Sequence, residues 1–156
     1  MVDADHLAVI RGAPFMNHLV LLEAGTGELE SILRGVKTML IGEHDPARPT
    51  ASPVTPGDGL FFLRDTDEGA VRVRATVARV LPLSGTTHEG LSHTLKEMQP
   101  RLQLTEDQYN HWSTKRQAFL VELESAHKVD VIHVAPNRIP DPSDWIAFGE
   151  LREITE

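Results

Sequence analysis

The sequence contains no cysteine, few aromatic residues and no long apolar run. Without cysteine the chain forms neither a disulfide framework nor a thiolate metal site, which fits a reducing compartment. The longest apolar runs, HLVLL and GLFFL, are about five residues, far short of the ~20 that a membrane-spanning helix needs. The N-terminus also lacks the basic and apolar regions of a secretory signal. We therefore expect a cytoplasmic protein that does not cross a membrane.

The length of the chain favours a single domain. A chain of 156 residues buries a core without metal or disulfide cross-links, and no linker, internal repeat or low-complexity block divides it. We predict one domain over residues 16–156. It follows an N-terminal extension, residues 1–15, and ends in a C-terminal extension from about residue 136.

Basic residues are unevenly distributed in this acidic chain, whose formal net charge is −8. Residues 34–85 contain seven of the 15 basic residues. If the fold gathers several on one face, a local positive patch forms on an acidic protein. The alternative is that they are ordinary solvated side chains on strands. The seven are Arg34, Lys37, Arg48, Arg64, Arg72, Arg74 and Arg79.

The first elements are a strand, a short helix and a second strand. NHLVLL, residues 17–22, is an apolar run typical of a buried strand. TGELESILRG follows as a helix, with Thr26 as the expected N-cap and Gly35 as the residue that ends it. KTMLIG then predicts a strand that begins with Lys37.

A proline-rich loop separates this strand from a hairpin. EHDPARPTASPVTPGDG contains four prolines, which lack an amide donor, so we expect a loop there. GLFFLRD and VRVRATVARVLPL then form the hairpin. Alternation in the second strand places Val71, Val73 and Val77 on one face, with Arg72 and Arg74 on the other.

Two helices and a long strand follow. Capping-box spacing at Thr86 to Glu89 and at Thr105 to Gln108 predicts where the helices begin. AFLVELESAHKVDVIHV is either one bending strand or two strands joined at ESAH. The tail DPSDWIAFGELREI adds a last short strand.

This order lacks the helix between every pair of strands that a parallel βαβ sheet requires. We therefore predict an α+β fold: a mixed, mostly antiparallel β-barrel with short helices packed at its ends.

Several short motifs resemble the ASCH family of the PUA-like superfamily. Gly35, Lys37 and Thr38 stand where the family has its Gly-x-Lys-Thr start, and VTPGDGLFF resembles its Pro-Gly-Asp turn before a strand. VRVRATVARV and HWSTKRQAFLVELESAHKV resemble a later strand, and a helix that leads into a returning strand. The chain departs from the signature G-x-K-x-x-E-x-R, because Leu40 and Gly42 occupy its acidic and arginine positions.

The resemblance implies two kinds of activity. Some small relatives are amidohydrolases on acylated cytidines that use a lysine, a threonine three residues later and a distant glutamate. Here the lysine is Lys37 and the glutamate is Glu97. Leu40 at the threonine position cannot act as a nucleophile, so Thr38 is the displaced candidate. Other relatives are metal-dependent ribonucleases.

The preferred hypothesis is a PUA-like module that binds RNA or a nucleotide in a basic cleft beside Lys37, beneath the proline-rich loop. Several cations and a few stacking rings are what such a cleft requires. Because aromatics form only 5% of the chain, we expect one splayed nucleotide rather than a broad stacking surface. The candidate binding residues are Arg34, Lys37, Arg48, Arg72, Arg74, Tyr109 and Trp112.

We expect no cofactor and no metal site. The eight histidines include no HExxH pattern, and GTG lacks the further glycine or lysine of a nucleotide loop. Two alternatives to the binding module remain. One is a hydrolase on a modified nucleoside or a ribonuclease, and the other is a protein-interaction domain, indicated by the acidic C-terminal half.

Overall fold

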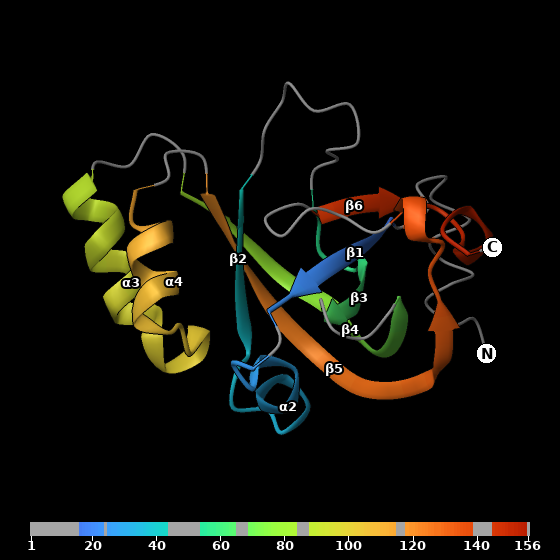
Figure 1. Ribbon diagram of the computed structural model, residues 1–156. Helices are drawn as coiled ribbons and strands as arrows, with labels where there is room; N and C mark the ends of the chain where they lie inside the picture. Colours follow the sequence, from blue (N-terminus) through green and yellow to red (C-terminus); the bar gives the residue numbers. More distant parts are fainter. Residues whose placement is uncertain are drawn as a thin grey trace, which may run out of the picture.

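The computed structural model consists of one curled β-sheet with short helices beside it (Figure 1). The predicted N-terminal extension, residues 1–15, lies outside the described residues, as does most of the proline-rich loop, residues 44–53. No helix in the described part is long and apolar enough to span a bilayer. The structure describes residues 16–23, 25–43, 54–64, 69–83, 88–114, 118–138 and 145–155.

The elements follow the predicted order closely. The strands are β1 (Asn17–Leu22), β2 (Met39–Glu43), β3 (Gly59–Arg64), β4 (Ala70–Pro82), β5 (Ala118–His133) and β6 (Trp145–Phe148). The helices are α2 (Glu28–Leu33), α3 (His88–Leu102) and α4 (Glu106–Trp112), with 3-10 turns η1 (Pro136–Arg138) and η2 (Leu151–Glu153).

The sheet is a mixed half-barrel. Its strand order is β2-β5-β4-β3-β1-β6. Every neighbouring pair is antiparallel except β1 and β3, which run parallel with Asn17 opposite Gly59. This confirms the predicted mixed, mostly antiparallel sheet with short helices. The sheet curls without closing, because β2 and β6 are its two ends and do not pair with each other in the described sheet (Figure 1).

Strand β5 is a single bent strand, which decides between the two alternatives for residues 118–134. It pairs with β4 through three register shifts, of which two leave extra residues on β5 and one leaves an extra residue on β4. Ser125, at the centre of ESAH, has a φ of 56°, a left-handed conformation that marks an irregularity in the ladder. The bends let β5 curve around the sheet from β2 to the C-terminal elements (Figure 1).

Helix α2 ends as predicted but begins differently. Gly35 has a φ of 73°, the left-handed conformation expected of a helix-ending glycine. The prediction of Thr26 as the N-cap was wrong, because Gly27 occupies that position with a φ of 72°. The Thr26 hydroxyl instead donates to the Glu23 carbonyl at 3.1 Å. Its hydrogen bond therefore closes the turn before the helix rather than capping it.

Helices α3 and α4 pack beside β2 and β5. The capping box of Thr105 and Gln108 is present at the start of α4, as predicted. Thr86 of the other predicted box lies outside the described residues. Helix α3 continues through Pro100 to Leu102.

Strand β2 separates two parts of the core. Successive side chains of a strand point to opposite faces. Leu40 accordingly joins the apolar cluster inside the half-barrel, whereas Met39 and Ile41 join the cluster beneath α3 and α4. The segment that leads from α2 into β2 therefore lies where the sheet interior meets the helices.

Gly42 lies close to an aromatic ring on the neighbouring strand. A Cβ at this position would lie 2.6 Å from the ring of Phe119, on the paired strand β5. A larger residue at position 42 would therefore require the ring to move.

Candidate functional site

Lys37 lies in the connection between α2 and β2 and is almost completely buried, with 2% of its surface exposed. Its Nζ donates a hydrogen bond to the carbonyl oxygen of Leu102, at the end of α3. The Glu28 Oε1, on the first turn of α2, is 3.7 Å from the same nitrogen. Lys37 is therefore held between two helices by one carbonyl and one carboxylate.

The surroundings of this pair disfavour charge on both partners. Burial lowers the pKa of Lys37, and the attraction of Glu28 only partly opposes this. Burial likewise raises the pKa of Glu28; Lys37 opposes the rise, and the nearby Glu23 adds to it. Buried titratable groups whose pKa values are shifted by burial and by a charged partner are concentrated at functional sites.

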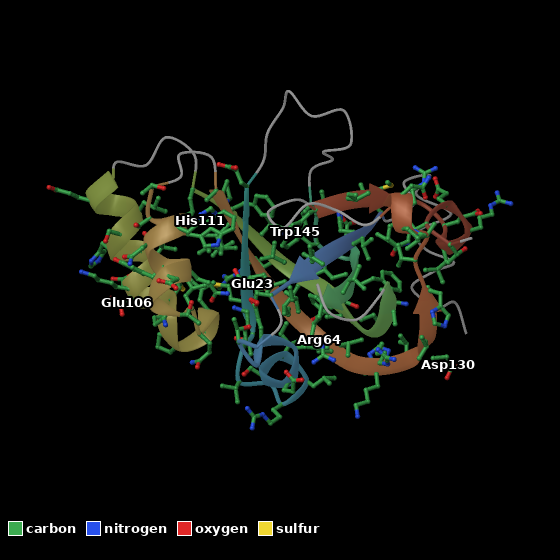
Figure 2. All side chains as sticks on the ribbon, in the orientation of Figure 1. Glu23, Arg64, Glu106, His111, Asp130 and Trp145 are labelled. Carbon is green, nitrogen blue, oxygen red and sulfur yellow. The ribbon has the colours of Figure 1, made fainter. Side chains whose placement is uncertain are left out.

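The pair borders a cavity of about 430 Å³. Its lining residues come from β1, α2, β2, α4 and β6 and from the segments next to them. Figure 2 shows Glu23, His111 and Trp145 grouped around β2, whereas Asp130 lies toward the far end of β5. The lining residues that define its chemistry are Glu23, Glu28, Lys37, Asp107, His111, Trp112 and Trp145.

Both tryptophans of the chain line this cavity. Trp112 comes from α4, where the His111 ring meets it edge-on with centroids 5.1 Å apart. Trp145 comes from β6 and packs edge-on against Phe119 at 5.4 Å. Trp145 was not among the predicted binding residues, because its position on a four-residue strand in the C-terminal extension offered no signal of a cavity.

The cavity differs in charge from the basic cleft that the sequence predicted. Lys37 is the one Lys or Arg side chain on its described lining, beside the carboxylates of Glu23, Glu28 and Asp107. Alternation along a strand predicts which residues share a face, but it does not predict which other element that face meets.

The other predicted cations lie elsewhere. Arg34 is exposed at the end of α2, and Arg72 is exposed on β4. Arg74 is half-buried, with its guanidinium 5.1 Å from the centroid of the Phe61 ring. Arg48 lies outside the described residues. Of the predicted binding residues that the structure describes, Lys37 and Trp112 are brought together.

Tyr109 faces away from the cavity although it shares α4 with Trp112. Its hydroxyl lies 2.5 Å from the Ser92 Oγ on α3, and its ring packs in the apolar cluster beneath the two helices. It also borders a separate, more open groove with Lys96 and Glu106. The described contacts of Tyr109 therefore join α4 to α3.

The three predicted catalytic residues are not gathered at one point. Thr38 follows Lys37, but its backbone N–H donates to the Arg101 carbonyl, and the residue does not line the cavity. Glu97 is exposed on α3 and pairs with His93 at 2.8 Å, one helical turn away. The carboxylate that lies beside Lys37 is Glu28, which the sequence presented only as a favourable charge at a helix start.

Comparison with solved structures shows the ASCH-domain fold. A crystal structure of a point mutant of the ASCH protein from Zymomonas mobilis matches with a TM-score of 0.62 and 12% identity, over 88% of this chain and 93% of that chain. The crystal structure of ASCH from Zymomonas mobilis matches with a TM-score of 0.55 and 13% identity, over 75% and 73%. No protein-family model and no curated protein sequence matches the chain. At these identities the likeness establishes the fold alone.

Proposed function

We propose that this chain, which has the ASCH-domain fold, binds RNA or a nucleotide by taking a single base into the cavity beside Lys37. The observation that supports this most directly is the meeting of two indole rings and a buried Lys–Glu pair around one cavity. Its volume of about 430 Å³ lies within the range of roughly 300–1,000 Å³ typical of small-ligand sites.

The indole rings supply flat surfaces for a base. Bases that stack on aromatic side chains gain about 1–3 kcal/mol each, and any base can use such a surface because all have a π-face. Trp112 and Trp145 reach the cavity from different elements, α4 and β6. A base that enters between the elements meets at least one ring.

The polar edge of the base meets fixed hydrogen-bonding groups. Four successive residues of the chain, 20 to 23, line the cavity. Because side chains alternate along a strand, a continuous run indicates that the backbone edge itself borders the cavity. In the part of the chain that the structure describes, β6 pairs with β1 from Asn17 to Val20, and no described strand pairs with this edge at Leu21 or Leu22. Backbone amides, Glu28 and Lys37 together provide both donors and acceptors.

The phosphate groups stay outside the cavity in this mode of binding. The lining carries more carboxylates than ammonium groups, so it does not attract a polyanion. Affinity therefore depends little on counterion release, and the logarithm of the association constant falls only slightly with the logarithm of salt concentration. A steep salt dependence would instead indicate binding along the phosphate backbone at another surface.

Intrinsic tryptophan fluorescence tests the proposal directly, because both tryptophans line the cavity. Titration with nucleosides, nucleotides and short single-stranded RNAs is expected to change the emission of the wild-type protein. Trp112→Phe and Trp145→Phe leave one reporter each. Lys37→Met is expected to weaken binding, whereas Lys128→Met, the same change at an exposed position on β5, is not. Saturable binding unaffected by Lys37→Met and by both tryptophan changes would refute the proposal.

A second candidate function rests on the protonation of Lys37. An amine whose pKa is lowered by burial beside a carboxylate is suited to act as a general base or a nucleophile. A hydrolase on a modified nucleoside, or a ribonuclease, would use Lys37 with Glu28. Incubation with acylated cytidine and with RNA, with and without a divalent metal, tests this. Turnover that Lys37→Met abolishes and Lys128→Met preserves would support it, and absence of turnover would leave binding alone.

A further inference from the structure

The described lining of the cavity carries negative charge in addition to the buried Lys37–Glu28 pair. Glu28 and Lys37 lie 3.7 Å apart and carry opposite charges when both are ionised, so the pair contributes no net charge. Glu23 and Asp107 remain, and neither forms an ion pair with any described residue. His111 is the one other titratable side chain on the described lining. A guest in this cavity therefore experiences a negative potential from two carboxylates on different elements.

The aromatic lining favours the same sign of charge. The face of an indole ring is electron-rich and attracts a cation placed over it, more strongly than a phenyl ring does. Trp112 and Asp107 both extend from α4, while Trp145 lies on β6 and Glu23 follows the end of β1. Carboxylates and indoles thus border the same space, and both disfavour an anionic guest.

We propose that the preferred guest is a nucleobase that carries a positive charge on its ring at neutral pH, such as methylation of a ring nitrogen produces. This inference rests on the proposed function and specifies the class of base. A flat cationic ring can stack on the indole faces and is also attracted by the two carboxylates. A neutral base of the same size gains the stacking alone. Glu23 and Asp107 are both exposed, and even at the dielectric constant of water two carboxylates near a unit charge favour the cation by roughly tenfold in affinity.

Isomeric nucleosides separate charge from shape. Adenosine methylated on ring nitrogen 1 is a cation at neutral pH, whereas the isomer methylated on the exocyclic amino group is neutral and differs in the position of the methyl group and by one proton. Isothermal titration calorimetry of the wild-type protein with both isomers and with unmodified adenosine measures the preference. We expect the cationic isomer to bind roughly tenfold tighter than either neutral nucleoside.

Variants of the two carboxylates locate the source of the preference. Asp107→Asn and Glu23→Gln each remove one charge and are expected to reduce the preference severalfold, and the double variant to abolish it. Glu106→Gln is the matched control, because Glu106 neighbours Asp107 on α4 but borders the separate groove with Tyr109 and lies on the outer side of the helix (Figure 2). It is expected to leave the preference unchanged.

The results of these titrations test the preference for a cationic base separately from the proposed binding of a single base. Equal affinity for the two isomers, or tighter binding of the neutral one, overturns the inference and leaves single-base binding in place. A preference that survives in the double variant, or falls equally in Glu106→Gln, also overturns it. If no nucleoside, charged or neutral, binds to the folded protein, the proposed function itself fails.

Discussion

Replacing Lys37 by methionine removes the charged end of a buried side chain while keeping most of its apolar stem. Two partners then lose their contact: the Leu102 carbonyl oxygen and the Glu28 carboxylate. Leaving one member of a buried ion pair without its partner costs about 3–5 kcal/mol. Glu28 keeps 13% of its side chain exposed and can take up a proton, which reduces this cost. We expect Lys37→Met to lower the free energy of unfolding by about 3 kcal/mol at neutral pH.

The loss of stability in Lys37→Met is expected to become smaller as the pH falls. Burial raises the pKa of Glu28 above its ordinary value of 4.5, and removal of Lys37 takes away the attraction that opposes this rise. The folded variant therefore binds a proton at Glu28 more tightly than the unfolded chain does. Its stability increases as the pH falls from neutral through the pKa of Glu28 in the folded state, down to about the unfolded value. The deficit relative to wild type is expected to shrink over this range.

Urea unfolding followed by far-ultraviolet circular dichroism measures both effects across a pH series. Glu28→Gln and the double variant complete a double-mutant cycle, for which we expect a coupling energy of about 1–2 kcal/mol. Lys128→Met, on the exposed part of β5, is expected to change stability by less than about 0.5 kcal/mol. If Lys37→Met is as stable as Lys128→Met at every pH, the structural reasoning about the pair is wrong.

Three further changes test the fold around the site. Gly42→Ala is expected to destabilise the protein by about 1–3 kcal/mol in urea unfolding, because its Cβ would lie 2.6 Å from the Phe119 ring; an unchanged midpoint would contradict this. Asp58→Asn weakens the buried 2.8 Å contact with His18. Burial would raise the pKa of Asp58, but hydrogen bonds from His18 and Thr55 outweigh it and lower the pKa. The cost of Asp58→Asn, about 1–3 kcal/mol, should therefore be present above pH ~4 and disappear as the pH falls through the folded-state pKa; a cost independent of pH would refute this. Thr105→Ala removes a capping box and should lower stability by about 1 kcal/mol, with helicity lost from α4; no change would show that the cap contributes nothing.

The sequence predicted well those features that depend on local chemistry. The strand at residues 17–22, the glycine that ends α2 and the capping box of α4 each follow from side chains within a few positions of one another. The alternation of buried and exposed residues along β4 was also predicted correctly, because Val71, Val73 and Val77 are buried while Arg72 is exposed. Such features require no knowledge of distant partners.

Features that depend on which elements meet in space could not be predicted in this way. Nothing local to Glu28 distinguishes a carboxylate that stabilises a helix start from one that pairs with a lysine nine positions later. The parallel pairing of β1 with β3 likewise depends on the crossover through α2 and β2. Trp145 reaches the cavity because β6 pairs with β1, where Trp145 lies opposite Val20. The two strands are more than a hundred residues apart in the sequence. The acidic character of the cavity follows from such contacts.

The hydrogen bond from Lys37 to Leu102 has a thermodynamic consequence. The Lys37 Nζ, which borders the cavity, also joins the last turn of α3 to the segment before β2. A guest that competes for the Lys37 Nζ weakens its hydrogen bond to Leu102. Occupancy of the cavity and packing of α3 are therefore coupled in free energy. Because such coupling is reciprocal, any partner that holds α3 more firmly against the sheet, even from its outer face, would alter how tightly the interior accepts a guest.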